Sequence, residues 1–192
     1  MRSSTKIRRS RVRKLRVHLA VLLIFVGTAA VADNDWWNSF YRDTIYPLAL
    51  NVYHEARGES ALGRQMVAYV TVERARENRR EWGGNTIHGV VYHGCQFSWT
   101  CDPNIGAPRN AEAWEAAENA AILVALGLFN PPPVLEDARY YMNPDAASQR
   151  GRCWFAENLR QIGMVGRHYF YTEGEPRPMP VHFGCDADTP IV

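Results

Sequence analysis

The sequence predicts one mainly helical α+β domain with a small β element, preceded by an N-terminal segment of a different character. Four stretches have the caps, stops or apolar spacing of helices, and two short aromatic runs suit strands. Internal repeats and low-complexity stretches are absent. The 160 residues that follow the first 32 are an ordinary length for one domain, and such a chain buries about 70% of its extended surface.

The first 32 residues have the layout of an export signal. Met1 to Arg16 include eight Lys or Arg residues and no acid, and an apolar or small run follows from Leu19 to Ala32. The run is shorter than the about 20 apolar residues that span a bilayer, and it ends in the small-x-small pattern of Ala30 to Ala32. We expect cleavage after Ala32, which leaves residues 33–192 in the periplasm or outside the cell. The alternative is an uncleaved anchor that holds the domain at the membrane.

Removal of this segment changes the sign of the net charge. The whole chain has a formal charge of +2, whereas residues 33–192 have 14 Lys or Arg against 20 Asp or Glu, a formal charge of −6. The basic residues near the N-terminus have no aromatic residues between them to stack on bases, so we expect no nucleic-acid partner. We expect the exported part to be a monomer.

Four cysteines remain in the exported part, and their even number in an oxidising compartment indicates two disulfides. Three pairings of Cys95, Cys101, Cys153 and Cys185 are open at this point. A zinc site is disfavoured because no Cys-x-x-Cys spacing occurs. We expect neither a metal nor a cofactor.

The first exported helix is expected from Thr44 or Pro47 to Ala56, because proline is tolerated in a first turn and Gly58 follows as a stop. Steps of three and four residues place Glu55 on the apolar stripe of this helix, which consists of Ile45, Leu48 and Val52. A second helix is expected from the cap Ser60 to about Glu77, ending near Asn78, as the hairpin partner of the first.

The later elements are shorter or separated by loops. We expect a short helix from Thr86 to Tyr92, and then a loop from Gly94 to Pro108. A long helix begins at the cap Asn110 and ends at Gly127 and a triple proline. Its expected buried face consists of Trp114, Ala117, Ala121, Val124 and Leu128. The aromatic runs 138–141 and 168–171 are expected to be short strands or the walls of a groove.

The chemistry of the chain centres on Glu55. Burial of a carboxyl raises its pKa, so the group can stay protonated near neutral pH and donate a proton to a leaving glycosidic oxygen. The structural alternative is an ion pair of Glu55 with Arg57 or Arg64 at the helix end. Glu59 has a simpler explanation, as a cap of the following helix. The pair His54 and Glu55 does not continue as a zinc-binding His-Glu-x-x-His motif, because Gly58 stands where the second His would be.

Four ordered blocks resemble the SleB-like cell wall hydrolases, the family that includes spore-cortex-lytic enzymes. The blocks are Leu48 to Glu59, Gly63 to Ala68, Gly89 to Tyr92 and Cys95 to Asp102. Ala138 to Tyr141, Ile162 to Gly163 and His168 to Tyr171 also resemble the C-terminal half of that family. The resemblance covers roughly residues 45 to 172. The segment from Met142 to Glu157 and the Arg- and Gly-rich connection from Asn78 to Thr86 depart from it.

The resemblance implies a lysozyme-like catalytic domain that cleaves the bond between N-acetylmuramic acid and N-acetylglucosamine in peptidoglycan, often as a lytic transglycosylase. It also implies that Glu55 is the catalytic acid and that Glu59 is a supporting residue. Aromatic faces for sugar rings are expected at Phe97, Trp99, Tyr141 and Tyr171, for which core packing is the structural alternative. Hydrogen-bonding groups beside them are expected at Gln96, Ser98 and His168. We expect Cys95 to pair with Cys101 and fix the loop between them, which leaves Cys153 with Cys185.

Several functions remain open at this point. A transglycosylase needs one acid that protonates the leaving oxygen and then deprotonates the muramoyl C6 hydroxyl. A hydrolytic muramidase needs a second carboxylate within about 5 to 9.5 Å, for which Glu59 and Asp102 are the candidates. A non-catalytic wall-binding module is the third hypothesis. An amidase that cuts the stem peptide is the fourth, and it would need a metal or a nucleophile that the matched blocks lack.

Overall fold

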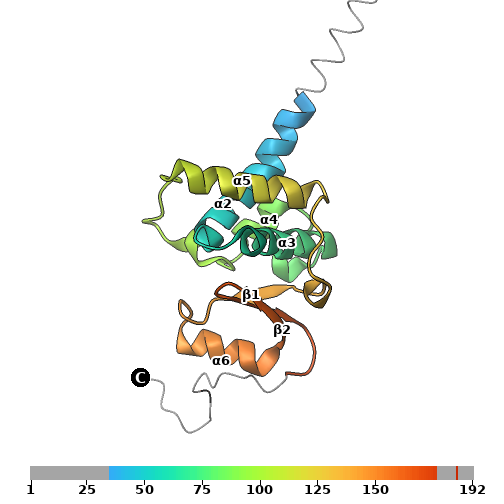
Figure 1. The fold of residues 1–192 in the computed structure, drawn as a ribbon, viewed down its shortest axis with the longest axis vertical. Helices are drawn as coiled ribbons and strands as arrows, with labels where there is room; N and C mark the ends of the chain where they lie inside the picture. The colour runs from blue at the N-terminus through green and yellow to red at the C-terminus, as the bar shows by residue number, and fades with distance from the viewer. Residues whose placement is uncertain (1–34, 177–184, 186–192) are drawn as a thin grey trace, which may run out of the picture. The chain divides into compact units, whose positions relative to one another are not determined.

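The computed structural model describes residues 35–176 and residue 185 of the 192-residue chain (Figure 1). The predicted export signal and its cleavage point after Ala32 lie outside the described residues. The chain divides into two compact units, Met1–Tyr41 and Arg42–Val192. The described part of the first unit is helical, and the Trp36 ring stacks on that of Phe40 with 5.3 Å between centroids. None of the described helices is long and apolar enough to cross a membrane.

The four predicted helices are present, and their caps explain where they begin. A π-helical turn, η1 (Tyr41–Ile45), leads into α2 (Tyr46–Ala56). The Ser60 hydroxyl accepts a hydrogen bond from the Gly63 N–H at the start of α3 (Ala61–Glu77), and Thr86 caps α4 (Ile87–Tyr92) in the same way. The side chain of Asn110 accepts from the Ala113 N–H at the start of α5 (Ala111–Ala125). Short 3₁₀ turns occur at η2 (Arg80–Trp82), η3 (Ser98–Cys101) and η4 (Pro133–Leu135).

The β element is a three-stranded antiparallel sheet. Strands β2 (Arg160–Val165) and β3 (His168–Thr172) form a hairpin, and β1 (Tyr140–Met142) pairs with the other edge of β3. The strand order is therefore β1-β3-β2, with an irregular register between Gln161 and Gly163. The two aromatic runs of the sequence are the neighbouring strands β1 and β3.

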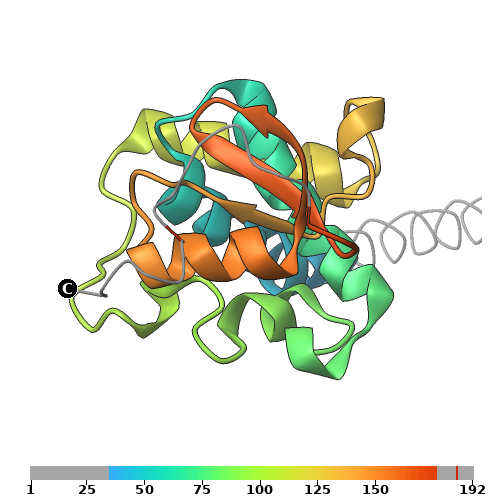
Figure 2. The same cartoon turned by 90° about the horizontal axis from the view of Figure 1, so that it is seen from below.

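The sheet lies between two helical layers, with α2 to α5 on one side and α6 (Gln149–Asn158) on the other (Figures 1 and 2). Side chains alternate along β3. Phe170 packs with Met66 and Val70 of α3, whereas Tyr171 packs against Phe155 of α6 with 5.0 Å between ring centroids. The mainly helical α+β class with a small β element is confirmed.

The structure corrects the prediction at two places. Leu128 is 64% exposed instead of lying on the buried face of α5, because the helix ends at Ala125 and Gly127 takes a left-handed φ of +69° that turns the chain. Helix α6 and strand β2 have no counterpart in the prediction. No residue of α6 is buried and most of β2 is half-buried, so neither has a clear apolar stripe in the sequence.

Candidate functional site

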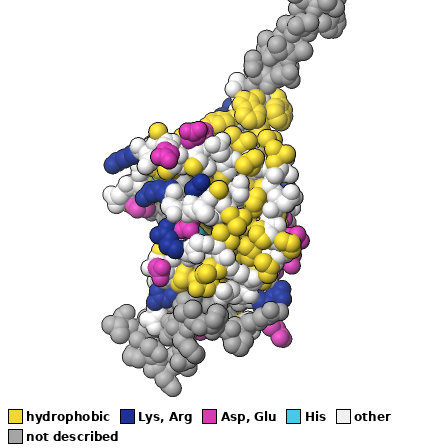
Figure 3. Space-filling model, in the orientation of Figure 1, with side chains coloured by type: hydrophobic (Ala, Val, Ile, Leu, Met, Phe, Trp, Pro, Cys, Tyr) yellow, Lys and Arg dark blue, Asp and Glu magenta, His cyan; other side chains and the backbone are white. Residues whose placement is uncertain are grey.

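One cavity of about 1080 Å³ lies where the end of α2, the η3 loop, β1 and the start of α6 meet. The sequence-predicted residues that line it are Glu55, Gln96, Phe97, Ser98, Trp99, Tyr141 and His168. The edge of the molecule that carries the η3 loop and the loop after β1, at the left in Figures 1 and 3, displays charged side chains of both signs. The cavity lining therefore combines aromatic and polar side chains.

Glu55 lies in the last turn of α2, on the stripe whose other members, Ile45, Leu48 and Val52, are fully buried. Burial raises the pKa of Glu55 from 4.5 to about 7. Among the described residues its carboxyl has no ion-pair or hydrogen-bond partner. The Arg64 guanidinium instead donates to the backbone oxygen of Glu59 at 2.5 Å, so the ion-pair alternative does not hold there. The site thus contains a carboxyl that is half protonated near neutral pH.

Tyr141 of β1 is an aromatic residue whose pKa depends on the charge of Glu55. Burial first, and the charge of Glu55 second, raise the pKa of its phenol well above the usual value. The hydroxyl oxygen is buried and lies near the Asn51 side chain, without a hydrogen bond of ordinary geometry within the described part of the chain. A buried hydroxyl without a partner costs roughly 1–3 kcal/mol, which a ligand oxygen could offset.

Trp99 forms an aromatic wall that is fixed to the helix of Glu55. Its indole N–H donates to the side-chain oxygen of Asn51 at 2.9 Å, and the Asn51 amide donates to the Thr71 hydroxyl at 3.1 Å. The indole also stacks on the His54 ring, with 4.6 Å between centroids and 23° between planes. Because Asn51 lies one turn before Glu55 on α2, the wall and the carboxyl share one rigid support.

The η3 loop between Cys95 and Cys101 carries the other predicted contacts, and the disulfide between these cysteines is confirmed. The Gln96 amide makes one hydrogen bond at each end, accepting from Arg74 at 3.0 Å and donating to the Glu81 backbone oxygen at 2.9 Å. Phe97 is only 3% exposed and lines the cavity. Ser98 is the first residue of η3 and lines the cavity beside it.

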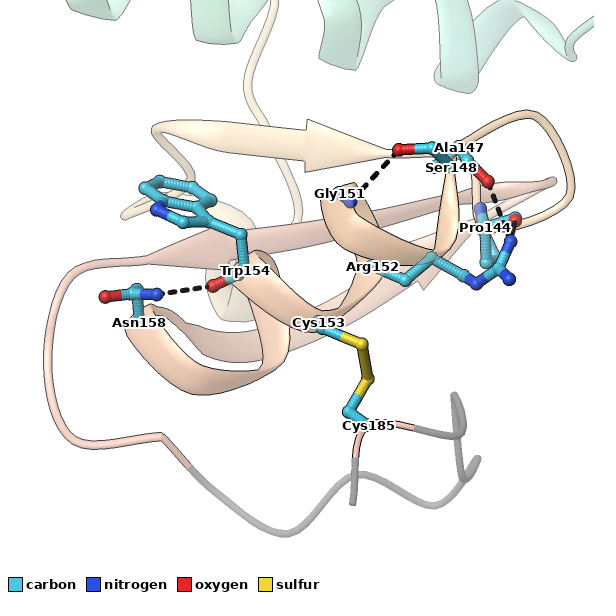
Figure 4. The surroundings of a disulfide bond; sticks show 9 residues. All are labelled: Pro144, Ala147, Ser148, Gly151, Arg152, Cys153, Trp154, Asn158 and Cys185. Atoms are coloured by element: carbon cyan, nitrogen blue, oxygen red, sulfur yellow. Dashed lines mark hydrogen bonds between the residues drawn. A yellow bond between two sulfur atoms is a disulfide. The ribbon is translucent and has the colours of Figure 1, made fainter. Parts of the chain in front are cut away.

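The opposite wall is the loop from Asn143 to Ser148, which joins β1 to α6. The Arg152 guanidinium donates to the backbone oxygens of Pro144 and Ala147 at 3.1 and 2.7 Å, and Ser148 caps α6 (Figure 4). Next to Arg152, Cys153 forms the second predicted disulfide with Cys185, which is also confirmed (Figure 4). One arginine of α6 therefore holds this loop in shape.

Glu59 does not line the cavity. It is 7% exposed, and its carboxylate accepts hydrogen bonds from the side chain of Arg167 at 2.8 Å and from the Arg167 N–H at 3.2 Å. Burial raises the pKa of Glu59, but the two Arg167 contacts outweigh burial and leave it below its usual value. Glu59 thus connects the α2–α3 turn to the β2–β3 hairpin as an ionised group, away from the reacting space.

His168 and Tyr171 point to opposite faces of the sheet. His168 is 3% exposed and lines the cavity, and its buried Nδ1 lacks a hydrogen-bond partner among the described residues. Burial is the main reason that its pKa is lowered. Tyr171 is fully buried against α6. The expectation that Tyr171 offers a face to sugar is wrong, because residues an odd number of positions apart in a strand face opposite sides.

Sequence reasoning missed four contributors to the site: Asn51, His54, Arg74 and the loop before α6. Asn51 lies one helical turn before Glu55, and His54 lies one residue before it, in the same sequence block. This proximity was the signal that could have identified them as site residues. Arg74 carried no signal, because a charged residue within a helix is usually solvated. Asp102, an exposed residue, also lines the cavity, and its carboxylate accepts a hydrogen bond from the Asn104 N–H at 2.9 Å. The described residues contain no cluster of three His, Cys, Asp or Glu side chains suited to a metal ion.

Comparison with known proteins agrees with the arrangement of these elements. The sequence profile of the family described as Cell Wall Hydrolase matches residues 58–171. The chain belongs to the cell wall hydrolase family. The match begins just after Glu55.

The sequence similarity to individual members of the cell wall hydrolase family extends over most of the described residues. The spore cortex-lytic enzyme of Bacillus cereus is 31% identical over 133 residues, which are 69% of this chain and 46% of that protein. The corresponding enzyme of Bacillus subtilis (strain 168) is 32% identical over 131 residues, 68% of this chain and 38% of that protein. The chain thus spans less than half the length of these relatives.

A solved structure supports the fold. The catalytic domain of the germination-specific lytic transglycosylase SleB from Bacillus anthracis is similar to this chain with a TM-score of 0.50 and 30% identity. The similarity covers 67% of this chain and 93% of that domain. The expected lysozyme-like architecture is therefore the fold that this member of the cell wall hydrolase family adopts.

Proposed function

We propose that this protein cleaves the glycan strands of peptidoglycan between N-acetylmuramic acid and N-acetylglucosamine, with Glu55 as the general acid. One observation carries the proposal: Glu55 has a pKa raised to about 7 by burial, has no ion-pair partner in the described structure, and lines the cavity with Trp99 and Tyr141. The membership in the cell wall hydrolase family supports the choice of substrate.

The geometry favours a lytic transglycosylase. Protonated Glu55 donates its proton to the glycosidic oxygen, and the bond between this oxygen and the muramoyl C1 breaks. The Glu55 carboxylate then removes the proton of the muramoyl C6 hydroxyl, whose oxygen attacks C1 and closes a 1,6-anhydro ring. The carboxyl regains its proton and no water is consumed. One acid suffices, and Glu59 is already occupied by Arg167. A lytic transglycosylase with 30% identity supports the same choice.

A hydrolytic muramidase is the second candidate. Asp102 favours it, because this carboxylate lines the same cavity as Glu55 and could act as a base or nucleophile. The two reactions differ in their product. Hydrolysis leaves a reducing N-acetylmuramic acid end, whereas the transglycosylase leaves an anhydro end.

The decisive experiment is the digestion of purified sacculi by the wild-type protein and by Glu55→Gln, with mass spectrometry of the released fragments. We expect anhydromuropeptides from the wild type and a loss of at least about a hundredfold in the variant. Glu115→Gln is the matched control, because this exposed α5 residue is remote from the cavity lining. Undiminished cleavage by Glu55→Gln would remove this residue from the mechanism.

The same digestion separates the remaining hypotheses. Reducing ends that disappear in Asp102→Asn would identify a hydrolase. Binding to sacculi without any released fragment would indicate a wall-binding module, and free amines with intact glycan chains would indicate an amidase.

We further propose that the domain is exported as a monomer after cleavage behind Ala32. The basic and apolar layout of the first 32 residues and the wall substrate of the family support this location. The mass of the protein recovered from the periplasm or medium checks the cleavage point, and an intact N-terminus in the membrane fraction would indicate an anchor.

A further inference from the structure

Arg74 is a buried cation that the proposed chemistry does not use. It lies on α3, is 7% exposed, and is surrounded by the rings of Trp82, Phe97 and Tyr140, whose centroids lie 5.1 to 5.8 Å from its guanidinium carbon. No described carboxylate forms an ion pair with it. Burial lowers its pKa, which shows that the charged form is poorly solvated. Buried cations are normally paired with an anion, so the unpaired state of Arg74 is unusual.

Two of the three guanidinium nitrogens of Arg74 are engaged with the protein. Nε donates to the backbone oxygen of Arg139 at 2.7 Å, and Nη1 donates to the side-chain oxygen of Gln96 at 3.0 Å. Nη2 has no hydrogen-bond partner among the described residues. Arg74 also lines the cavity. The two fixed nitrogens hold the guanidinium in one orientation, and the third remains available to a molecule in the cavity.

Arg74 and Glu55 both lie near Tyr141. The Tyr141 phenol lies close enough to both charges that each affects its pKa. All three residues line the same cavity. An anionic group bound by Arg74 would therefore lie in the same cavity as the bond that Glu55 protonates.

We propose that Arg74 binds a carboxylate of the glycan substrate and thereby makes the cavity selective for muramoyl residues. This inference rests on the proposed glycan cleavage and adds the chemical group that is recognised. Arginine suits this task because its planar N–H groups bind carboxylates through strong, charge-assisted hydrogen bonds. The lactyl side chain distinguishes N-acetylmuramic acid from N-acetylglucosamine. The carboxylate is either the free lactyl group of an unsubstituted residue or belongs to the stem peptide.

The test measures binding by calorimetry in the Glu55→Gln background, which prevents turnover. Two ligands are used: glycan strands freed of peptides, which carry lactyl carboxylates, and peptide-bearing strands. Each is also prepared with its carboxylates converted to amides by carbodiimide and ammonium. We expect amidation to weaken binding about tenfold or more when Arg74 is present. If amidation weakens the binding of peptide-free strands, the recognised carboxylate is the lactyl group. If amidation weakens only the binding of peptide-bearing strands, the recognised carboxylate belongs to the stem peptide.

The protein-side arm adds Arg74→Gln, in which amidation should have no further effect. Arg74→Lys keeps the positive charge and replaces Arg74→Gln in the test if the Gln variant does not fold. We expect Arg74→Lys to retain part of the effect of amidation on binding. Arg76→Gln is the matched control, two residues along α3, exposed and paired with Glu73. Arg57→Gln tests the other, exposed arginine at the cavity.

Three results would overturn the inference: no effect of amidation with Arg74 intact, an equal effect in Arg74→Gln, or an effect that disappears in Arg57→Gln instead. If the wild type still releases anhydromuropeptides, only the role of Arg74 falls. If no strand is cleaved or bound at all, the proposed function falls with it.

Discussion

At the scale of single residues, the central feature is the burial of one acid without a counter-ion. The unfolded chain holds Glu55 with a pKa near 4.5, and the fold raises this value to about 7. Below pH 4.5 the group is protonated in both states and does not disfavour folding. Between pH 4.5 and 7 the unfolded chain loses this proton while the folded state retains it, so the stability associated with the neutral acid falls progressively and is fully lost above pH 7.

This sign gives a prediction for Glu55→Gln, which is neutral at every pH. The free energy of unfolding of the variant should equal that of the wild type, apart from a constant offset, below pH 4.5. Between pH 4.5 and 7 the free energy of unfolding of the variant should rise progressively above that of the wild type, beyond this offset. Above pH 7 the additional difference should stay constant at about 3 kcal/mol. Urea unfolding at pH 4, 6 and 8 measures the difference. A constant difference across the series would show that burial does not perturb this carboxyl.

The sequence predicted the position of a single residue correctly where helical spacing alone determines which side of the helix the residue occupies. The steps of three and four residues located Glu55 on a stripe whose other members are fully buried in the structure, while Glu55 itself is half-buried. It failed for Tyr171, because the aromatic run could not show which alternate residues face α6. Arg74 was inaccessible to prediction, since its ring partners come from three separate parts of the chain.

At the scale of elements, the α2–α3 turn and the β2–β3 hairpin are joined by Glu59. Gly166, with a φ of +59°, lies so close that a Cβ atom there would be 2.0 Å from Oε2 of Glu59. Gly94 has a similar φ of +54° and open space around it. The two glycines therefore separate backbone strain from displacement of the Glu59 carboxylate.

We predict that Gly94→Ala lowers the free energy of unfolding by about 1 kcal/mol, from backbone strain alone. Gly166→Ala should cost roughly 3 kcal/mol or more, since it also displaces the charged hydrogen bonds of Glu59. Denaturant titration of both variants checks this order. Equal losses would mean that Glu59 moves aside without consequence.

The Cys95–Cys101 disulfide restrains the loop that carries Gln96 to Trp99. Replacement of both cysteines by serine should lower the free energy of unfolding by about 2 kcal/mol, because the closed loop is short. We expect a larger relative effect on sacculus digestion, a loss of tenfold to about a hundredfold, because cavity residues are displaced. Cys153→Ser with Cys185→Ser is the comparison. A greater loss of activity in this second pair would assign the cavity geometry to α6.

Element-scale prediction followed the strength of local signals. The caps Ser60, Thr86 and Asn110 fixed three helix starts, because their side chains satisfy the first N–H groups of each helix. Helix α6 could not be predicted, since its placement depends on the sheet and on a disulfide to Cys185 instead of an apolar face.

At the scale of the whole molecule, the cell wall hydrolase domain is a unit separate from residues 1–41. A chain that begins at Asp33 should therefore keep its thermal midpoint within about 2 °C and its activity on sacculi. Differential scanning calorimetry with a digestion assay checks both. A lower midpoint would show that the N-terminal segment supports the domain.

The hydrogen bond between Trp99 and Asn51 limits how the substrate range of this fold can change. Since the indole is hydrogen-bonded to the helix that carries the acid, the distance between the proton donor and the aromatic plane keeps a constant size. Saccharides of different bulk, such as strands with modified acetyl groups, must then be accommodated from across the cleft. Evolution of substrate range should concentrate in residues 143–148, two of whose backbone oxygens accept hydrogen bonds from the Arg152 guanidinium.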